Sequence, residues 1–493
     1  MKLQAIGYEA LIQKFNLDVI PNWHRSFIAL DTHIHRIERD GNSIREIYPQ
    51  KYMIDESIMN HLEFAFKYDG VNLAILHLIF EHIGQKEVVK YILTKPTGKY
   101  VRKIWYFYEF LMNIKLPIED LKQGNYIDLL DTKQYYTIKN PQSIKRYRVR
   151  DNLLGDRRFC PMVRKTKILK EFENRNLSAK SKQLMRNYPD RVLKRALSYL
   201  YTKETKSSFE IEQISPSTSR IERFITLLKE AQKADFCTKD RLITLQNRIV
   251  DSRFADNDYR SSQNYVGESL SFWGEKIHYI SPKPKDLLSL MEGLIDSHQK
   301  MIGDEDLAVV HATVIAYGFV YLHPFEDGNG RIHRFLLHNI LANENFTPKE
   351  IIFPISAVML KNPNEYENSL ESFSSKLLSL IDYELDEEGK MSVLNDTKLW
   401  YQFIDMSEQV EAIYTFITQT IDNELNRELE FIVNYDSSKK AIQEIVDMPD
   451  RKIDLFIRFS MQNGGKLSSN KRKKYFEFLS DKEVELIEKS IKR

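Results

Sequence analysis

Apolar residues recur at helical spacing through most of the chain. In the N-terminal part this pattern covers Ser57–Tyr68, Leu73–Ile83 and Trp105–Ile114, and further along it covers residues 284–302 and 396–432. Apolar positions three and four residues apart form one face of an amphipathic helix. The pattern therefore predicts a mainly α-helical fold.

The most apolar segment runs from Leu307 to Leu322, and a second helical pattern covers Ile332–Ala342. The segment between them is polar and rich in glycine. The first segment is shorter than the roughly 20 residues of a membrane-spanning helix and contains His311, which favours a buried core helix. Two apolar helices joined by a short polar loop place that loop at one end of a buried helix pair.

Strand patterns are few. Lys276–Ile280 alternates between polar and apolar residues and stops before Pro282, which is typical of a short strand. Residues 125–147 combine β-branched and aromatic residues and indicate a short strand or hairpin. Residues 147–167 are strongly basic, and we expect a solvated loop there, with a partner-binding surface as the alternative.

The C-terminal part begins with a linker-like stretch, Asn434–Ser438, and continues with two or three helical patterns and the basic run Asn470–Lys474. This part resembles a small winged-helix or helix-turn-helix module only weakly. The pattern as a whole predicts three regions: residues 1–204, mostly helical; residues 205–432, a helical core; and residues 433–493, a small helical or winged-helix-like module.

Composition narrows the picture. The 493 residues include 72 Lys and Arg and 70 Asp and Glu. The net charge is therefore small and does not indicate a general electrostatic attraction to nucleic acid or membranes. Two cysteines, Cys160 and Cys237, give no disulfide framework. The first residues lack the continuous apolar stretch of a signal peptide. We therefore expect a cytoplasmic protein.

The polar loop carries the candidate chemistry. Gly328-Asn329-Gly330 can adopt positive φ and turn successive N–H groups toward an anion. The loop leads into a helix N-terminus, which favours phosphate. Arg331 and Arg334 lie three residues apart, on one helix face, and guanidinium groups suit phosphate oxygens.

His323 and the loop carboxylates complete this set. A histidine, with an ordinary pKa of about 6.5, can accept a proton near neutral pH, and Asp327 or Glu326 could hold Mg²⁺ beside phosphates. Alone, such a histidine is more often a helix cap, Gly-Asn-Gly a turn, and an arginine pair a solvated face. Their combination within one short stretch favours a site for a phosphorylated ligand.

This stretch resembles the signature of the Fic family, His-x-Phe-x-(Asp or Glu)-Gly-Asn-Gly-Arg-x-x-Arg. Every fixed position is met, by His323, Phe325, Asp327, Gly328, Asn329, Gly330, Arg331 and Arg334. The resemblance implies a Fic helical-bundle core with a small β-hairpin flap, and transfer of AMP from ATP to a hydroxyl side chain of a target protein.

The resemblance also implies roles for these residues. His323 would be the general base, Phe325 would anchor the loop, and Asp327 would bind Mg²⁺. Asn329 and the N–H groups of Gly328 and Gly330 would hold the α- and β-phosphates. Arg331 would brace the phosphates, and Arg334 would bind the γ-phosphate. Tyr366 is a candidate for lining the nucleotide pocket, with core packing as the alternative.

A second resemblance lies before the core, in the helix predicted for residues 215–232. Fic proteins often carry an inhibitory helix, (Ser or Thr)-x-x-x-Glu-(Gly or Asn), and Thr218 to Glu222 resembles it, although Arg223 stands where Gly or Asn is expected. Glu222 would then pair with Arg334 and keep it from the γ-phosphate. The alternative is a capping box between Ser219 and Glu222.

The predicted strand corresponds to the flap of the family, and its residues are Lys276, Ile277, His278, Tyr279 and Ile280. An edge strand at this place would bind a target protein by strand addition. Self-modification, a homodimer and DNA, the least favoured, are the other candidate partners. The alternative functions are transfer of phosphate or phosphocholine, removal of AMP, and DNA-binding regulation through the C-terminal module.

Overall fold

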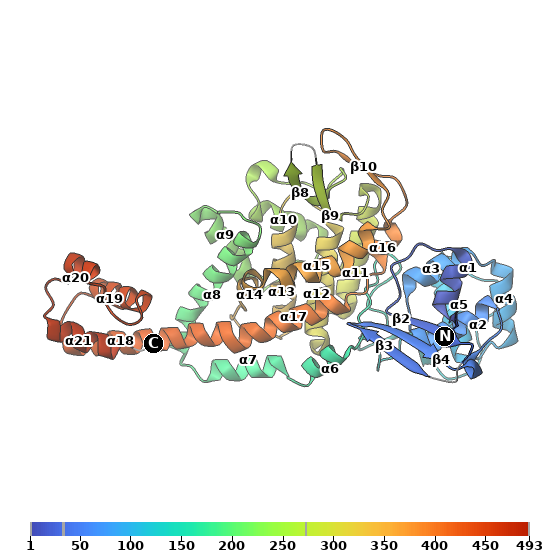
Figure 1. Ribbon diagram of the computed structural model, residues 1–493, viewed down its shortest axis with the longest axis horizontal. Coiled ribbons are helices and arrows are strands. Elements are labelled where there is room, and N and C mark those ends of the chain that lie inside the picture. Colours follow the sequence, from blue (N-terminus) through green and yellow to red (C-terminus); the bar gives the residue numbers. More distant parts are fainter. Residues whose placement is uncertain (1, 32–34, 272–273, 492–493) are drawn as a thin grey trace. The chain divides into compact units, whose positions relative to one another are not determined.

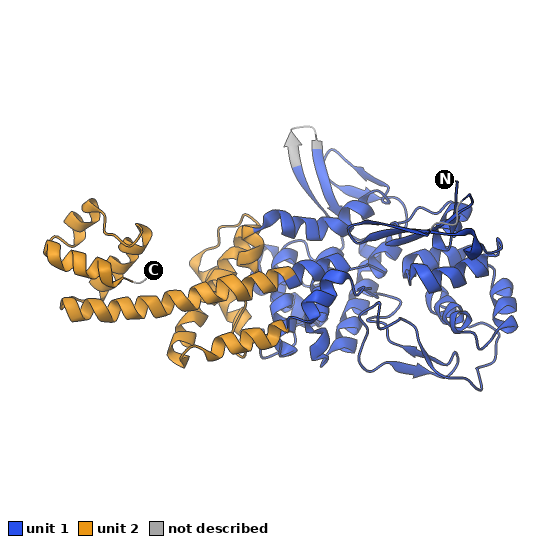
Figure 2. Cartoon of the chain, turned by 60° about the horizontal axis from the view of Figure 1, so that its bottom comes forward, with its two compact units in different colours: residues 1–175, 230–346, 362–414 blue, residues 176–229, 347–361, 415–493 orange. Residues whose placement is uncertain are grey.

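The computed structural model describes residues 2–31, 35–271 and 274–491, and it is mainly α-helical, as the sequence predicts (Figure 1). The chain divides into two compact units (Figure 2). Unit 1 contains residues 1–175, 230–346 and 362–414, and unit 2 contains residues 176–229, 347–361 and 415–493. The signature residues 323–334 belong to unit 1.

The N-terminal part of unit 1 contains a four-stranded sheet that the hydrophobic pattern did not predict. The strands lie in the order β1-β2-β4-β3, with β2 and β4 parallel and the other two pairs antiparallel. Their bounds are β1 Leu3–Ile6, β2 His24–Ala29, β3 Arg36–Asp40 and β4 Ser43–Tyr48. Such short strands, with buried and exposed residues unevenly mixed, give a weak period-2 signal.

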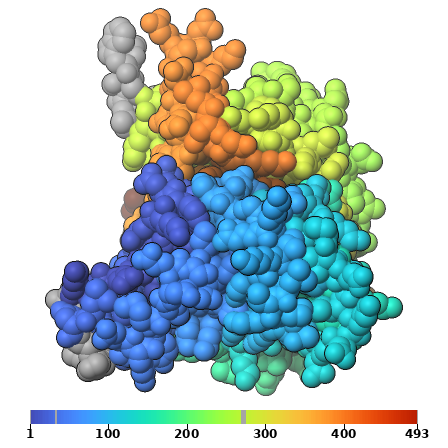
Figure 3. Space-filling view, turned by 90° about the vertical axis from the view of Figure 1, so that its right-hand side faces the viewer, coloured from blue at the N-terminus to red at the C-terminus, as the bar shows by residue number. Residues whose placement is uncertain are grey.

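Helices accompany this sheet, and the three helical segments predicted from the pattern are confirmed. The bounds are α1 Tyr8–Phe15, α2 Ile58–Phe64, α3 Leu73–Glu81, α4 Gln85–Thr94 and α5 Lys99–Met112. One apolar core contains residues of α1 to α5, with Trp105, Phe107 and Phe80 among its largest fully buried side chains. Figure 3 shows the face on which this N-terminal region lies below the segment around residues 383–393.

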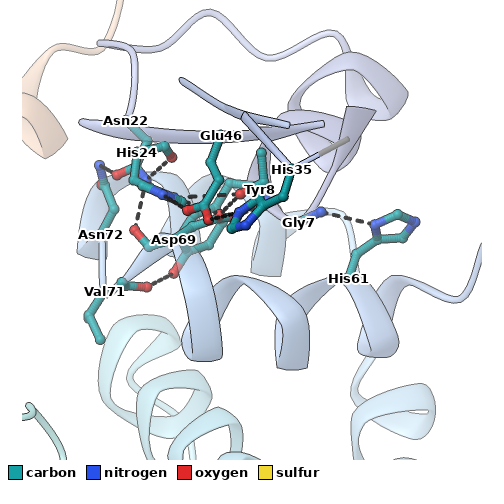
Figure 4. Close-up of polar contacts among 12 residues, drawn as sticks. Gly7, Tyr8, Asn22, His24, His35, Glu46, His61, Asp69, Val71 and Asn72 are labelled. Atoms are coloured by element: carbon teal, nitrogen blue, oxygen red, sulfur yellow. Dashed lines mark hydrogen bonds and ion pairs between the residues drawn. The ribbon is translucent and has the colours of Figure 1, made fainter. Parts of the chain in front are cut away.

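A buried polar cluster lies beneath the sheet (Figure 4). Asp69, at the end of the short π-helix Ala65–Asp69, is fully buried and accepts hydrogen bonds from the backbone N–H of Tyr8 and from Ser26. His24 lies between Asp69, at 3.2 Å, and Glu46, at 2.8 Å. Buried charges require partners of this kind, so the cluster joins α1, β2, β4 and the residues before α3.

The basic segment 147–167 is not a solvated loop, and that prediction is wrong. Its short strand β7 Val149–Asp151 pairs with β5 Ile127–Asp128 and β6 Gln142–Ile144, which confirms strand structure in residues 125–147. Arg164 is buried and donates to Asp405 at 2.7 Å. Arg158 is bonded to Asp156 and Asp296. The arginines therefore tie this segment to the helical core.

The helical core of unit 1 positions the signature residues. α12 and α13 pack closely together, α11 packs on α12, and α10 contacts α13. The bounds are α10 Lys239–Ile249, α11 Pro284–Met301, α12 Ala308–Leu322, α13 Asn329–Asn343, α15 Pro363–Leu378, α16 Lys398–Gln402 and α17 Ser407–Gln419, the last of which ends in unit 2.

The span Glu305–Leu322 has the length and apolarity to cross a membrane, but 83% of it is buried inside the structure. Most of this span is α12, and only one of its fifteen residues is not buried. A buried core helix meets the same criterion by length and composition, so this finding agrees with the core helix that the sequence predicts.

The predicted hairpin is confirmed. β8 Tyr265–Ser271 pairs antiparallel with β9 Gly274–Ile280, and β9 packs against α15 (Figure 1). A second small hairpin, β10 Tyr383–Leu385 with β11 Met391–Val393, follows α15. The hydroxyl of Tyr265 donates to the carbonyl of Gly389 in the turn of this second hairpin, at 3.3 Å.

Unit 2 is helical in its described part. Its bounds are α7 Leu177–Arg186, α8 Asp190–Ile211, α9 Thr218–Glu230, α14 Ile355–Lys361, α18 Asn426–Ile445, α19 Asp450–Gln462, α20 Ser469–Tyr475 and α21 Asp481–Ser490. α8 packs on α14 and α18, and the buried Glu204 of α8 accepts from the backbone N–H of Ser356 at 2.9 Å.

The expected linker Asn434–Ser438 is wrong, because these residues lie inside α18. The C-terminal end of α18 shares an apolar core with α19, α20 and α21, including Ile442, Phe456, Phe476 and Ile487. The described residues 433–491 contain no strand that could form a wing. The C-terminal module is therefore helical, and its final helix begins with a capping box formed by Ser480 and Glu483.

Candidate active site

The loop between α12 and α13, residues 323–328, turns sharply at both ends. His323 has a left-handed backbone, with φ 49° and ψ 58°, and its N–H donates to the carbonyl of Phe319 at 2.9 Å. Gly328 precedes α13 with φ 92°, which favours glycine. A Cβ at Gly328 would lie 2.9 Å from Val250 Cγ1. We call residues 323–328 the signature loop.

Phe325 and Asn329 hold the signature loop in shape. The Phe325 ring is fully buried. The Asn329 side chain accepts from the Phe325 N–H at 3.1 Å and donates to the Phe325 carbonyl at 2.7 Å. The sequence prediction that Phe325 anchors the loop agrees with this geometry. The observed contacts of the Asn329 side chain are to the loop backbone, so it shapes the loop from within.

The His323 side chain is half-buried, and its Nδ1 lies 3.1 Å from the carbonyl of Val320. A carbonyl can only accept, so Nδ1 carries the proton and the lone pair of the neutral ring lies on Nε2. Burial lowers the pKa of His323 to about 4, and the nearby Arg260 cation acts in the same direction. The ring is therefore neutral at pH 7.

Arg260 lies next to His323 although no pattern in the sequence marks it. It is 5% exposed and follows α10 in the connection to β8. Its Nε donates to the His323 carbonyl, at 2.7 Å, and its backbone N–H donates to the Pro324 carbonyl, at 2.8 Å. The contact joins residues 63 positions apart in the chain, which is why local sequence reasoning missed it.

The first turn of α13 carries the expected anion-binding groups. Its N–H groups precede the first intrahelical hydrogen bond, which runs from Ile332 N–H to the Gly328 carbonyl at 2.9 Å, and such groups attract anions. Of the two glycines, only Gly328 has positive φ, because Gly330 lies inside the helix. Arg331 and Arg334 are both almost fully buried on this helix.

The two arginines have different neighbours. Arg331 donates to the Asp327 carboxylate at 2.6 Å and to the Ile249 carbonyl at 3.4 Å. Arg334 donates to the Tyr366 hydroxyl at 3.5 Å. Tyr366 is buried on α15 and so lies beside the predicted phosphate-binding residues, as expected for either pocket lining or core packing. The sequence-predicted residues of the signature therefore come together at one end of the α12–α13 pair.

The flap residues divide into two groups. Tyr279 and Ile280 are buried, and the Tyr279 hydroxyl donates to the Tyr321 carbonyl in α12. Lys276 is exposed, and Ile277 and His278 are half-buried. Side chains at 279 and 280 therefore anchor the flap, and only the first three flap residues offer side-chain surface to a target protein.

The predicted inhibitory residues lie on α9, in unit 2, whereas Arg334 lies in unit 1. The pairing of Glu222 with Arg334 therefore stays a prediction. The capping-box alternative is wrong, because α9 already begins at Thr218, and Ser217 accepts the Arg220 N–H at 3.4 Å. Ser219 lies inside the helix, and Glu222 is exposed on it.

Within the described residues, no three His, Cys, Asp or Glu side chains gather so that they could hold a metal ion by themselves. A Mg²⁺ ion bound with a nucleotide needs fewer protein ligands, because phosphates and waters supply the others. The Asp327 side chain, 43% exposed in the signature loop, has the chemistry for one such ligand.

Comparison with known proteins gives a family match over residues 236–341, to the Fic/DOC family. The chain is 30% identical over 128 residues to Protein adenylyltransferase Fic of Nematostella vectensis, covering 25% of this chain and 27% of that protein. It is 31% identical over 121 residues to Protein adenylyltransferase Fic of Culex quinquefasciatus, covering 24% and 22%. The chain thus spans about a quarter of the length of these curated relatives.

Two solved structures are also similar. A Fic family protein from Desulfovibrio desulfuricans G20 matches with a TM-score of 0.36 and 17% identity, covering 62% of this chain and 83% of that one. A Fic domain containing signaling protein from Bacteroides thetaiotaomicron VPI-5482 matches with a TM-score of 0.34 and 17% identity, covering 53% and 94%.

Proposed function

This chain belongs to the Fic family, and on that premise we propose that it transfers AMP from ATP to a hydroxyl side chain of a target protein. One observation carries the proposal. The signature loop has a neutral histidine at one end, whose Nδ1 is held by a backbone carbonyl. At its other end is the N-terminus of a helix that carries two buried arginines. The names of the curated relatives, protein adenylyltransferases, support the same reaction.

His323 is the proposed general base. Its Nδ1–H is held by the Val320 carbonyl, so Nε2 is the atom that would accept the proton of the target hydroxyl. The hydroxyl oxygen would then attack the α-phosphorus of ATP, and pyrophosphate would leave. Proton transfer to a positioned base typically contributes about 10²–10⁴-fold to a rate.

A base with a pKa of about 4 is weak by itself. Bound ATP would bring several negative charges to the first turn of α13, close in sequence to His323. Negative charge nearby favours the protonated ring and raises its pKa. Asp327 already acts in that direction on His323. We therefore expect His323 to be a better base in the nucleotide complex than in the free protein.

The phosphates would lie at the N-terminus of α13. The N–H groups of its first turn, together with Arg331 and Arg334, supply donors and positive charge there. Asp327 would contribute a ligand to Mg²⁺, and that ion, when bound, neutralises phosphate charge and orients the leaving group. Because Asp327 is also paired with Arg331, its carboxylate would be correctly oriented before ATP binds.

The flap would present the target. β8 and β9 form a two-stranded sheet in the described residues, so an extended segment of a target protein can add a further strand through backbone hydrogen bonds. Such binding reads little side-chain sequence. It would place one target hydroxyl beside His323 while Lys276, Ile277 and His278 select among targets.

Glu222 would inhibit this reaction. It is exposed on α9, and pairing with Arg334 would remove that arginine from the γ-phosphate. Relief of the inhibition would require α9 to release the arginine. The same exposure makes Glu222 a favourable residue for substitution, because its side chain makes no large contribution to packing.

The test is transfer from α-labelled ATP with Mg²⁺, using the wild type, Glu222→Gly, and Glu222→Gly combined with His323→Ala. Label on a lysate protein or on the chain itself should be strongest with Glu222→Gly and lost with the double change. Mass spectrometry of the labelled protein then identifies the transferred group. Because Glu222→Gly also places glycine inside a helix, it should lower stability by about 0.5–1 kcal/mol.

Two results would contradict the proposal. Label from all three proteins would remove His323 from the chemistry. No label from any of them, with ATP binding intact, would exclude AMP transfer and leave transfer of another group. A matched control is Arg223→Gly, the neighbouring exposed position on α9. It has a similar helix cost, and because glycine is the residue that the inhibitory pattern expects there, it should keep or strengthen inhibition.

A further inference from the structure

Arg260 joins three parts of unit 1 through one guanidinium group. Nε donates to the His323 carbonyl, Nη1 to the Ser262 carbonyl and Nη2 to the Pro282 carbonyl, each at 2.7 Å. Pro282 lies two residues beyond the end of β9, and Ser262 lies three residues before the start of β8. The side chain thus contacts the base of the flap on both sides and the residue proposed as the catalytic base.

The residues after Arg260 extend this connection. Gln263 donates to the Ser281 carbonyl at 2.8 Å, and the Ser281 hydroxyl donates to the Asn264 carbonyl at 2.7 Å. Asn264 donates to the Phe325 carbonyl at 3.3 Å, and Ser262 is bonded to Glu326. We call Arg260 with residues 262–264 and 281 the flap clamp. Its contacts reach both the flap and the signature loop.

Keeping Arg260 charged at this buried position costs free energy. The residue is 5% exposed, and among the described residues its hydrogen-bond acceptors are carbonyl groups rather than carboxylates. Burial lowers the pKa of Arg260 to about 10. A buried cation without a bonded carboxylate costs free energy, so a purely structural tie would be made at lower cost by a neutral side chain.

We infer that Arg260 is a positioning residue that couples the flap to His323, so that a target strand bound on the flap has its hydroxyl in a fixed place relative to His323 Nε2. This inference rests on the proposed function and deepens it. The guanidinium fork is suited to the task because its donors are fixed in one plane. A shift of either the flap or the loop would break two or more of these hydrogen bonds.

The same cation acts on the base through its charge. Arg260 holds the pKa of His323 down, in addition to the effect of burial. Removal of the charge should therefore raise the pKa of His323 and move the acid limb of the pH–rate profile to higher pH. A side chain that only supported the fold would not move this limb, so the pH profile separates positioning at the base from general stability.

The experiment compares Arg260→Gln and Arg260→Lys in the full chain, in whichever of the wild type and Glu222→Gly transfers AMP faster. Arg260→Gln loses both fork and charge. Arg260→Lys retains the charge but cannot reproduce the planar fork. The measurements are kcat and KM for AMP transfer from ATP, the pH–rate profile, and hydrogen exchange of residues 276–282 and 323–327.

We expect kcat to fall by about 10–100-fold in both variants, the scale of a small misplacement of reacting groups. KM for ATP should stay within about twofold, since the phosphate-binding residues of α13 are untouched. The acid limb should move to higher pH in Arg260→Gln but not in Arg260→Lys. Hydrogen exchange should rise in both the flap and loop segments of each variant.

The matched control is Arg158→Gln. Arg158 is also a multiply bonded arginine of unit 1, but its partners are carboxylates of its own loop and of α11, including Asp156 and Asp296. We expect this change to lower stability without changing kcat or the pH limb. Equal loss of kcat in Arg158→Gln and Arg260→Gln would overturn the inference.

If Arg260→Gln does not fold, Ser281→Ala tests the same clamp with a smaller change, because it removes one hydroxyl that bonds Asn264. It should raise hydrogen exchange in both segments and lower kcat. Exchange rising in only one segment, or in neither, would overturn the coupling. Hydrogen exchange can be measured in a protein that has no activity. If the chain transfers no AMP, the proposed function is refuted, but the exchange data still test the coupling between flap and loop.

Discussion

Two histidines in unit 1 have opposite surroundings and, we infer, opposite uses. His24, in β2, has a carboxylate on each ring nitrogen, Asp69 at 3.2 Å and Glu46 at 2.8 Å. His323, after α12, has a backbone carbonyl on Nδ1 and the Arg260 cation nearby. Burial opposes the charge of both rings. In His24 the two carboxylates outweigh burial and raise the pKa, whereas in His323 the pKa falls to about 4.

The comparison shows what makes a histidine that is partly or fully withdrawn from water available for chemistry. Two carboxylates occupy both nitrogens of His24 and favour its protonated form, so neither nitrogen is open to a substrate. One carbonyl leaves Nε2 of His323 with a lone pair and fixes the tautomer. Burial is common to both, and the identity of the partner decides between a structural cation and a candidate base.

The largest expected effect is on transfer when His323 becomes Asn. Asn tolerates the left-handed backbone seen at His323, so stability should change little, but its amide cannot take up a proton. AMP transfer should fall by about 10²–10⁴-fold. The measurement is labelled-AMP transfer together with a urea unfolding curve. Retained AMP transfer, or a large loss of stability, would show that His323 has a structural role rather than a catalytic one.

His24→Leu should have the opposite effect, a large loss of stability. Without the His24 ring, Asp69 stays fully buried and loses one of its partners, and breaking a buried ion pair costs about 3–5 kcal/mol. Urea unfolding measures the loss. The double variant with Asp69→Asn should be more stable than His24→Leu alone, since it removes the uncompensated charge. A double variant that is less stable would contradict this account of the cluster.

The pH dependence of stability should separate the two histidines further. The folded pKa of His24 is raised above its usual 6.5, so its contribution to stability is fully present below pH 6.5 and is lost as pH rises through the folded value. The slope is at most about 1.4 kcal/mol per pH unit for one proton. Urea unfolding between pH 6 and pH 9 should show wild type and His24→Leu converging as pH rises; parallel curves would contradict a charged His24.

The smallest expected effect concerns the backbone that carries His323. Gly328→Ala places a Cβ 2.9 Å from Val250 Cγ1 at φ 92°, and a side chain in left-handed backbone costs about 1–2 kcal/mol. Gly330→Ala is the matched control, because Gly330 is helical. Thermal unfolding should show a loss for the first variant and none for the second. Equal effects would mean that the loop does not need its left-handed turn.

Local patterns in the sequence predicted much of the site. The apolar segments before and after residues 323–331 determined α12 and α13, because helical periodicity and the turn residues His323 and Gly328 act within a few positions. The alternation at Lys276–Ile280 likewise predicted β9. The signature residues therefore lie at one end of the helix pair, because a short loop can join two packed helices only at their adjacent ends.

Other features depended on contacts that local patterns do not encode. The four-stranded sheet has short strands with little alternation, and its cluster joins His24 to Asp69 across 45 positions. The basic segment 147–167 carries a strongly polar composition, yet Arg164 becomes buried because Asp405, 241 positions away, bonds it. A basic composition therefore predicts a solvated segment only where no oppositely charged residue from a distant part of the chain packs against it.

By itself, the sequence determined which residues form the signature loop and which helices flank it, because those choices depend on neighbours along the chain. Only the tertiary structure decided the chemistry of His323. Its tautomer and low pKa come from the Val320 carbonyl, from burial and from Arg260. Arg260 reaches it across 63 positions, and electrostatic and hydrogen-bond effects of that kind depend on distance in space rather than along the chain.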